Sequence, residues 1–430
     1  MKKSKFIKST IILIIGGFIT KILGMVIKII MTRLLGTEGI GIYMLIMPTF
    51  SLFIGLAQFG LPVAISTLVA EDKRNNKNLV FSLIPLSFII NIVIIVLLIF
   101  FGRYLSINLI HEPRTYYGLL CIGLVLPFIS ISSIIRSYFF GKQRMVPHVI
   151  SNITEDVVRL IVIFIGVPIF LVKGIEYAVA FVVLSNIFSE LTSILILFFF
   201  LPKNFTISKN DFSINKTYIK DTLNISLPTT GSRLIGNIGY FLEPIILTTI
   251  LLKIGYSNTF IVTEYGIING YVMPLLLLPS FFTMAISQAL IPVVSNGFVN
   301  GNKKYVQNKI KQAIFISLLI GIPITVFFVG VPEVPLKFIY NTLEGIDYLK
   351  VIAPIFLLHY IQSPITSSLQ AMGKAKDAMY STFIGMVLRI IIITLLSFLH
   401  IGLWGIVVAT SFNIIFVTVY NFVKLKNYLK

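Results

Sequence analysis

The feature that most constrains this chain is a succession of long apolar segments separated by short polar connections. A stretch of about 20 mostly apolar residues is long enough to cross a bilayer as a helix. Hydrophobic residues make up 57% of the 430 residues and charged residues only 12%, whereas soluble domains are about 25% charged. The sequence therefore predicts an all-α polytopic membrane protein with about twelve transmembrane helices, over residues 10–34, 41–70, 79–101, 116–140, 148–172, 176–201, 221–252, 264–296, 308–330, 348–372, 378–399 and 402–423.

The longest polar connection, from Pro202 to Lys220, falls near the middle of the chain and separates six segments from six. We expect an N-terminal six-helix lobe over residues 1–205 and a C-terminal six-helix lobe over residues 206–430. Because six crossings return the chain to its starting side, the two lobes would keep the same orientation. Such repeats are related by a pseudo-two-fold axis along the membrane normal, with the substrate path between them.

The basic residues are distributed unequally between the two sides of the predicted membrane. Twenty-two Lys and Arg residues lie in the termini and the even-numbered connections, seven in the odd-numbered connections, and six inside the segments. Cytoplasmic loops carry the excess of basic residues. We therefore expect a multi-pass protein of a bacterial-type plasma membrane with both termini in the cytoplasm. This topology also accounts for most of the net charge of +19.

Internal similarity supports the presence of two repeats. Residues 136–142, Arg-Ser-Tyr-Phe-Phe-Gly-Lys, precede a segment that contains Arg159. Residues 369–374, Leu-Gln-Ala-Met-Gly-Lys, precede a segment that contains Arg389. The spacing from glycine to arginine is 18 residues in the first case and 16 in the second. The two arginines are therefore expected to be counterparts in the repeat.

The first apolar segment contains two lysines at positions where a membrane helix normally has none. Gly17, Lys21, Gly24 and Lys28 fall within an arc of about 60° on a helix. A charge in the bilayer core costs at least about 2.5–3.5 kcal/mol, so such residues usually face a bundle interior or a water-filled cavity. The glycines either leave room beside the lysines or let another helix approach. The alternative is that Lys28 reaches the interface and Lys21 pairs with a buried carboxylate; of the two, Lys21 is the stronger candidate for the cavity.

Two arginines near the middle of predicted helices differ in their local partners. Arg159 follows Glu155 by four residues, a spacing that favours an ion pair on one helix face. This pair could be purely structural. Four residues before Arg389 the chain has Gly385 instead of a carboxylate. We therefore expect Arg389 to be the better candidate for a positive charge that meets a ligand.

Further charged residues lie inside the predicted helices. Arg233 is about twelve residues into the seventh segment and faces either the cavity or a carboxylate, Glu190 or Glu243. Arg136 lies near the cytoplasmic end of the fourth segment, where contact with lipid phosphates is an equal alternative. The segments contain six basic residues and four acidic ones. This excess of positive charge favours an anionic ligand such as a diphosphate, with Arg136, Glu155, Arg159, Glu190 and Glu243 as structural or coupling charges.

Several function classes find no support in the sequence. The single cysteine, Cys121, excludes an intrachain disulfide and a cysteine-rich metal site, and the four histidines are scattered. Glycines at residues 36–41 lie at a helix boundary and indicate turns and close packing rather than a phosphate-binding loop. The longest odd-numbered connections, residues 102–115 and 331–347, hold no paired catalytic carboxylates. We therefore expect no metal, no cofactor, no nucleic-acid partner and no enzymatic activity.

Five stretches resemble one family of membrane proteins. They are Arg33-Leu-Leu-Gly-Thr-Glu-Gly-Ile-Gly-Ile-Tyr43, Gly60-Leu-Pro-Val-Ala-Ile-Ser-Thr-Leu-Val-Ala-Glu71, Tyr138-Phe-Phe-Gly141, Glu155-Asp-Val-Val-Arg159 and Tyr265-Gly-Ile-Ile-Asn-Gly-Tyr-Val-Met-Pro-Leu275. With these motifs the chain resembles the stage V sporulation protein B family. That family belongs to the polysaccharide biosynthesis branch of the multidrug/oligosaccharidyl-lipid/polysaccharide exporter superfamily, which includes the lipid II flippases.

The resemblance implies two six-helix lobes around a central cavity that opens alternately to each side. It also implies transport of a polyprenyl-linked sugar, in this family the peptidoglycan precursor for the spore cortex. By position, Lys21 and Lys28 match the cationic cavity helix of the lipid II flippases. The implied partners are a lipid-linked saccharide and membrane lipids, with cell-wall synthesis proteins as further candidates.

The leading hypothesis is a flippase that moves an anionic polyprenyl-diphosphate-linked saccharide from the cytoplasmic to the outer leaflet. Lys21, Lys28, Arg233 and Arg389 are the predicted substrate-binding residues. One alternative is a cation-coupled multidrug exporter of the same superfamily, which would need an acidic cavity residue such as Glu243. Another is a non-transporting scaffold for cell-wall synthesis, which gives no reason to bury so many charges.

Overall fold

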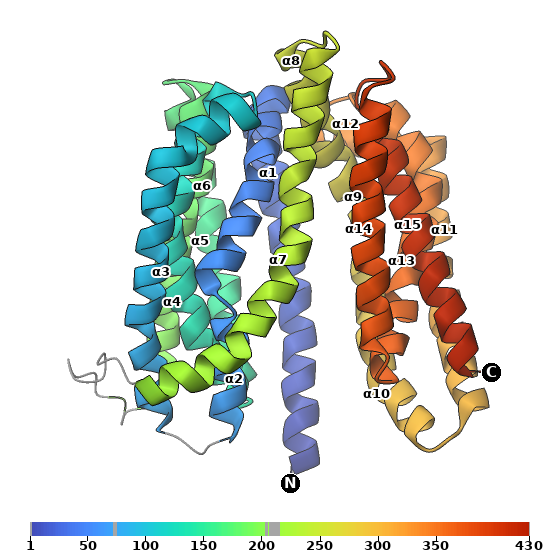
Figure 1. The fold of residues 1–430 in the computed structure, drawn as a ribbon. Helices are drawn as coiled ribbons and strands as arrows, with labels where there is room; N and C mark the ends of the chain where they lie inside the picture. The colour runs from blue at the N-terminus through green and yellow to red at the C-terminus, as the bar shows by residue number, and fades with distance from the viewer. Residues whose placement is uncertain (1, 72–74, 203–204, 206–215, 430) are drawn as a thin grey trace. The chain divides into compact units, whose positions relative to one another are not determined.

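The computed structural model describes the chain except for residues 1, 72–74, 203–204, 206–215 and 430. Most of the central connection, and with it the predicted lobe boundary at residues 205/206, lies outside the described part. Within the described part every regular element is a helix, and Figure 1 shows most helices running side by side. The predicted all-α fold is therefore confirmed.

In the first half of the chain, the described residues form eight helical elements. The N-terminal helix α1 is followed by the short helix α2 and by α3, and two short non-α turns, η1 and η2, precede α4. The hairpin of α5 and α6 completes this half (Figure 1). The bounds are α1 Lys2–Gln58, α2 Leu61–Glu71, α3 Asn76–Tyr104, η1 Leu105–Leu109, η2 Pro113–Thr115, α4 Tyr116–Gly141, α5 Met145–Leu171 and α6 Ile175–Phe200.

The second half of the chain begins with the long helix α7. A segment broken by the π-helical turn η4 follows, and then a series of helices of which one, α12, is only two turns long. The bounds are α7 Lys216–Lys253, α8 Asn258–Gly266, η4 Ile267–Val272, α9 Met273–Leu277, α10 Ser280–Val299, α11 Lys303–Gly330, α12 Glu333–Tyr340, α13 Ile346–Ala371, α14 Ala375–Ser397 and α15 Trp404–Leu429.

Eleven stretches of the described chain are long and apolar enough to cross a membrane, against about twelve expected segments. The first stretch, Ile15–Glu71, contains α2 and two helical parts of α1, because α1 bends at Gly36, where φ is 67° and ψ is −175°. Helix α5 is not among the eleven, since Glu155, Asp156 and Arg159 interrupt its apolar character. The expected single segment over residues 264–296 is split into two stretches near Pro279.

Two compact units make up the chain, Met1–Ile245 and Ile246–Lys430. In unit 1 a buried core forms where α2, α3, α4 and α6 meet, around residues such as Leu83 and Phe139. In unit 2 the core lies between α10, α11, α13, α14 and α15, around Val294 and Leu369. Most of α7 belongs to unit 1, so the division falls inside this helix.

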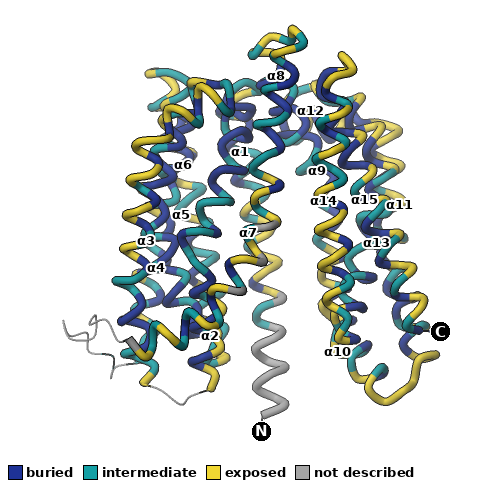
Figure 2. Tube along the Cα trace, viewed as in Figure 1, coloured by how far each residue is buried: buried dark blue, intermediate teal, exposed yellow. Residues whose placement is uncertain are grey.

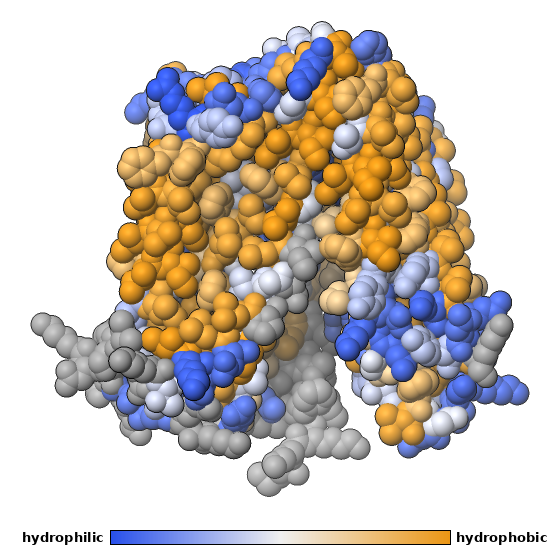
Figure 3. All heavy atoms as spheres, in the orientation of Figure 1, coloured by the Kyte–Doolittle hydropathy of each residue, from blue (hydrophilic) through white to orange (hydrophobic). Residues whose placement is uncertain are grey.

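The outer side chains of both units are apolar over most of the helix length. Phe100, Leu195 and Phe199 of unit 1 and Phe315 and Leu395 of unit 2 are exposed by 60% or more. Figure 2 places the buried residues inside each unit and the exposed ones on the outside. In Figure 3 hydrophobic side chains cover the middle of the helices, and hydrophilic ones gather toward their ends. This distribution matches helices that are surrounded by lipid.

The two units share one turn in the same backbone geometry. After α4, Lys142, Gln143 and Arg144 donate backbone hydrogen bonds to the oxygens of Tyr138, Phe140 and Phe139. After α13, Met372, Gly373 and Lys374 donate in the same pattern to Ser368, Gln370 and Leu369. The middle residue has a positive φ in both turns, 57° at Gln143 and 75° at Gly373. Each turn is followed by a helix that carries an arginine, Arg159 or Arg389.

This turn corrects the register of the repeat. The sequence comparison pairs Gly141 with Gly373, but the backbone pairs Gln143 with Gly373. In this register Arg159 and Arg389 each lie sixteen residues after the positive-φ residue. Only the second repeat has a glycine at this position. In the first repeat Gln143 adopts the left-handed conformation, which glycine adopts without steric cost. The same pattern also ends α7, at Gly255, and α10, at Gly301, so the correspondence of the two arginines rests on their equal spacing and not on the turn itself.

Candidate functional site: a cationic cavity in unit 1

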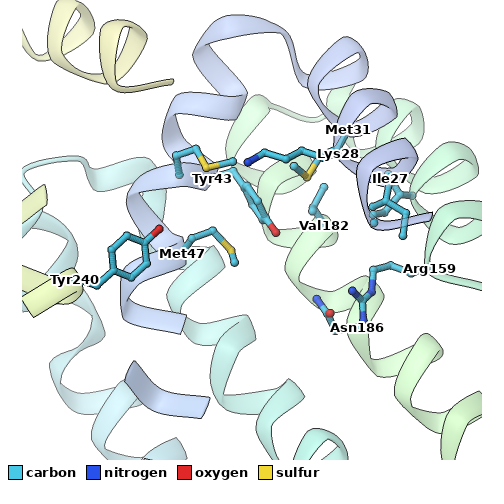
Figure 4. Close-up of a pocket in the computed structure, with 12 residues that line it drawn as sticks. Ile27, Lys28, Met31, Tyr43, Met47, Arg159, Val182, Asn186 and Tyr240 are labelled. Carbon is cyan, nitrogen blue, oxygen red and sulfur yellow. The ribbon is translucent and has the colours of Figure 1, made fainter. Parts of the chain in front are cut away.

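A cavity of about 260 Å³ lies inside unit 1. Helix α1 contributes residues from both sides of its bend, α5 and α6 form another wall, and α7 contributes Tyr240. Figure 4 shows that Arg159 and Asn186 lie next to one another, with the ring of Tyr43 between them and Lys28. The lining residues are Gly24, Ile27, Lys28, Met31, Tyr43, Met44, Met47, Arg159, Ile163, Val182, Asn186 and Tyr240.

Local sequence explains why Lys28 reaches this cavity. Lys28 and Gly24 lie one helical turn apart on the same face of α1 and both line the cavity. A Cβ atom at Gly24, or at Gly17 on the same face, would meet no atom within 4 Å. The glycines therefore leave room beside the lysines, and the alternative of a closely packed helix does not apply at these positions.

The lining combines two cations with polar and soft apolar groups. Lys28 and Arg159 supply the positive charge, and Tyr43, Tyr240 and Asn186 supply hydrogen-bonding groups. Three methionines, Met31, Met44 and Met47, form much of the remaining cavity lining. No Asp or Glu is among the lining residues of this cavity as far as the chain is described. Such a lining favours an anion, because positive charge in a low-dielectric site is stabilised by negative charge.

Arg159 is held firmly from its own helix. Its Nη2 donates to Oε1 of Glu155 at 2.5 Å, as the four-residue spacing predicts. Its Nη1 lies 3.9 Å from Oδ1 of Asp156, and its Nε donates to Oγ of Ser189 on α6 at 3.5 Å. The predicted ion pair is confirmed, yet 24% of the arginine side chain stays exposed, and Arg159 still lines the cavity.

Glu155 is shared by two arginines. Arg136 on α4 forms an ion pair with its Oε2, while Arg159 binds Oε1. Arg136 also lies 3.4 Å from Oε2 of Glu190 and donates to Oγ of Ser193 at 2.6 Å. Of the two alternatives for Arg136, contact with lipid phosphates is wrong, because its guanidinium points into this buried cluster.

The cluster joins three helices of unit 1 around five charged side chains. Glu190 on α6 also contacts the hydroxyl of Ser132. Glu155 and Glu190 are buried, and only 10% and 7% of their side chains are exposed. Burying a charge without a partner costs roughly several kcal/mol, so removing one member of this cluster should destabilise the packing of α4, α5 and α6. Sequence spacing could indicate only the contacts of Arg159 with Glu155 and Asp156, since the other contacts are tertiary.

The remaining predicted residues lie in different places. Lys21 is exposed on the same face of α1 as Lys28 but is not part of the cavity lining. Arg233 is an exposed residue of α7 in unit 1, and Glu243 is buried on the same helix. Arg389 is half-buried on α14 in unit 2. The structure thus brings Lys28 together with Arg159 in the lining of the unit 1 cavity, whereas Lys21 stays a predicted contact.

Three lining residues could not be singled out from the sequence. Tyr43 and Tyr240 are two of 18 tyrosines, and Asn186 is one asparagine inside an apolar helix. For Asn186 the sequence did carry an indication, a polar side chain in a membrane segment. Such side chains are energetically costly in the bilayer unless they face a partner or a cavity. In the described residues no cluster of three or more His, Cys, Asp or Glu side chains has a geometry suited to a metal ion.

Comparison with solved structures first defines the class. An inward-facing multidrug resistance transporter of the MATE family superimposes with a TM-score of 0.78 at 15% sequence identity, over 95% of this chain and 94% of that chain. At this identity the similarity concerns the fold alone. The chain therefore has the fold of the transporters in the multidrug/oligosaccharidyl-lipid/polysaccharide exporter superfamily.

Sequence comparison then defines the family. Residues 6–298 match the family described as polysaccharide biosynthesis protein, and residues 238–395 match the MatE family. Stage V sporulation protein B of Bacillus subtilis is 37% identical over 97% of this chain and 83% of the relative. Lipid II flippase MurJ of the same organism is 24% identical over 99% of this chain and 83% of the relative. The chain belongs to the polysaccharide biosynthesis protein family.

Proposed function

We propose that this protein is a flippase for an anionic polyprenyl-diphosphate-linked saccharide, with lipid II as the substrate and spore cortex formation as its setting. The observation that carries the proposal is the cavity of unit 1, whose lining, among the residues that the structure describes, contains two cations and no carboxylate. The relatives support the choice of substrate, since one is named as a lipid II flippase and another as a sporulation protein.

The physical problem for such a protein is the transfer of a charged head group across about 30 Å of hydrocarbon. A cationic cavity lowers the cost of desolvating the diphosphate, while the polyprenyl tail stays in the lipid. Alternating exposure of the site to the two sides would complete the transfer. An inside-negative potential favours outward movement of negative charge by about 2.3 kcal/mol per charge per 100 mV. The substrate undergoes no chemical change in this scheme.

The distribution of basic residues supports the direction of transport. Both termini and the even-numbered connections carry most of the Lys and Arg outside the membrane segments, which places them in the cytoplasm. The substrate would enter from that side of the plasma membrane. Lys21 and Arg233, which are exposed in unit 1, and Arg389 of unit 2 remain proposed contacts along its route. Membrane lipids and cell-wall synthesis proteins are the proposed partners.

The competing function is export of cationic drugs coupled to a proton or sodium ion. The positive charge of Lys28 and Arg159 opposes a cationic ligand in this cavity, because like charges repel strongly in a low-dielectric site. Expression of the protein in a drug-sensitive host separates the two functions. Resistance to cationic drugs without lipid II transport would favour the exporter.

The direct test uses vesicles that contain lipid II and this protein as the sole protein component. The fraction of lipid II that reaches the opposite leaflet is measured with an impermeant lipid II-binding probe. We expect exposure to be faster than in protein-free vesicles of the same composition. Equal rates in the two preparations, with correctly folded protein, would contradict the proposal.

A further inference from the structure

Arg159 belongs to two structural features at once. One side of its guanidinium is bonded within the buried charge cluster, and the same residue lines the cavity. A guanidinium has five N–H donors. Within the described residues, Glu155 and Ser189 accept two hydrogen bonds from it. The guanidinium therefore retains donors that can bind a ligand in the cavity.

The two cations of the cavity complement one another chemically. Arg159 comes from α5 and presents a planar fork that fits two oxygens of a phosphate, whereas Lys28 comes from α1 and acts as a compact point charge. Asn186 lies beside Arg159 (Figure 4) and can donate through its amide. The ring of Tyr43 separates this pair from Lys28 and brings a hydroxyl group to the same cavity.

The size of the cavity limits what it can hold. Pockets for drug-sized ligands measure about 300–1,000 Å³, and this cavity measures about 260 Å³. It can therefore accommodate one charged part of a lipid-linked saccharide but not the whole molecule. The part that matches two cations and several donors is the diphosphate.

We propose that Arg159 is a phosphate-binding residue of this cavity, that it acts with Lys28 on the diphosphate of the substrate, and that Glu155 positions it. The proposal rests on the proposed function for the choice of substrate. The pair between Glu155 and Arg159 is then part of the binding site and not only a brace between helices.

The assignment of Glu155 follows from its two partners. Oε1 of Glu155 binds Arg159 and Oε2 binds Arg136. The contact with Arg136 on α4 therefore fixes the carboxylate that orients Arg159 on α5. Arg136 is in turn bound to Ser193 and lies near Glu190 on α6. A side chain that is held in this way is pre-organised for its ligand, which reduces the entropy lost on binding.

The test measures binding of inorganic pyrophosphate to the purified full chain in phosphatidylcholine nanodiscs. Hydrogen bonds to charged groups are worth about 1.5–3 kcal/mol each, so Arg159→Gln and Lys28→Gln should each weaken binding by about 10-fold to 100-fold. Arg159→Lys should also weaken binding, since it keeps the charge but loses the fork.

Exposed cations away from the cavity provide the controls, and Arg103→Gln and Lys173→Gln should bind as the unaltered protein does. Unchanged binding by folded Arg159→Gln protein would overturn the proposal.

Glu155 allows a test in which the direction of the effect is decisive. If this carboxylate only neutralised charge, Glu155→Gln would strengthen pyrophosphate binding, because a negative charge beside the cavity is removed. If it positions Arg159, the same substitution weakens binding. Glu190→Gln is the matched comparison, since it removes a charge from the same cluster without a contact to Arg159, and binding should not weaken. Should Glu155→Gln fail to fold, Glu155→Asp decides the case, because it keeps the negative charge but shortens the reach to Arg159 and should weaken binding if Glu155 positions the arginine.

Two further arms identify the source of the phosphate and separate this proposal from the proposed function. Orthophosphate should bind more weakly than pyrophosphate, and phosphatidylglycerol nanodiscs should leave pyrophosphate binding measurable. Loss of binding in those discs would instead identify a phospholipid head group as the occupant.

Pyrophosphate binding without lipid II transport would overturn the flippase function alone. Lipid II transport that survives in folded Arg159→Gln protein would overturn the role of Arg159 alone.

Discussion

At the scale of single residues, the chain places charge in the membrane in two different ways. Arg136 forms ion pairs with Glu155 and Glu190 in a buried cluster. Lys28 and Arg159 line a cavity. The sequence indicated that these residues were unusual, because intramembrane charge is costly. It could not distinguish the two roles, since contacts between α4, α5 and α6 depend on tertiary packing.

Lys21 and Lys28 illustrate the limit of a helical-wheel argument. Their spacing correctly predicts a shared face, and the open space beside Gly17 and Gly24 is confirmed. The position of the cavity along α1 depends on the bend at Gly36 and on the packing of α5 and α6. The sequence alone therefore favoured Lys21, whereas the structure places Lys28 in the cavity lining.

Gly24 offers a prediction about the cavity volume. Gly24→Leu should weaken pyrophosphate binding in nanodiscs, because the added side chain extends into the cavity that Gly24 lines. Gly24→Ala should bind normally and unfold at a higher temperature, since alanine in a helix interior is favoured over glycine by about 1 kcal/mol. Gly17→Leu, on the same face but outside the lining, is the control. Equal binding by the two leucine variants would show that ligand does not enter beside Gly24.

At the scale of elements, the bend in α1 is the feature that shapes unit 1. The sequence analysis expects turns and close packing in the glycine-rich stretch of residues 36–41. The structure confirms a turn at Gly36, with φ of 67°, and close packing at Gly39, where a Cβ atom would lie 3.2 Å from Ile175. Past the bend, Glu38 forms an ion pair with Arg114 at 2.5 Å. Arg114 also binds Glu112, so the turn η2, which precedes α4, holds this part of α1.

Gly36 gives a stability prediction at this scale. Its backbone conformation is essentially restricted to glycine, and other residues there cost about 1–3 kcal/mol. A Cβ atom at Gly36 would meet nothing within 4 Å, so the penalty comes from the backbone and not from a clash. Gly36→Ala should therefore lower the thermal unfolding midpoint in detergent, whereas Gly24→Ala should not. Equal midpoints for the two variants would mean that α1 can straighten without cost.

The shared turn of α4–α5 and α13–α14 shows what sequence comparison could and could not find. It identified Arg159 and Arg389 as counterparts but aligned the turns at the wrong glycine. A residue in the left-handed region is often glycine, yet the first repeat uses Gln143 at this position. Sequence identity at one glycine was therefore a weaker guide than the hydrogen-bonding pattern of the turn.

At the scale of the whole molecule, the all-helical membrane fold was the most predictable feature. About 20 apolar residues are needed for each crossing, and this requirement located most helices within a few residues. It held for α5 despite the three charged residues near the middle of that helix, since the expected segment 148–172 matches Met145–Leu171. It was less accurate for the expected segment 264–296, because residues 258–299 are broken by a π-helical turn and by Pro279.

The predicted orientation in the membrane can be tested with single cysteines. The native Cys121 is buried, and a Cys121→Ala background leaves no other thiol. Asn300 and Glu344 are exposed residues in the connections on either side of α11 and α12. An impermeant maleimide added to intact cells should label Glu344→Cys but not Asn300→Cys until the cells are permeabilised. The reverse pattern would place the termini outside.

The most direct test of the central claim is lipid II exposure in reconstituted vesicles, compared between Lys28→Gln and Lys173→Gln. Lys28 lines the cavity of unit 1, and Lys173 is an exposed lysine in the connection between α5 and α6. If the cavity receives the diphosphate head group, the loss of one charged contact should slow exposure by about tenfold or more. The Lys173 variant should match the unaltered protein. Equal rates for the two variants, at equal amounts of folded protein, would contradict the account.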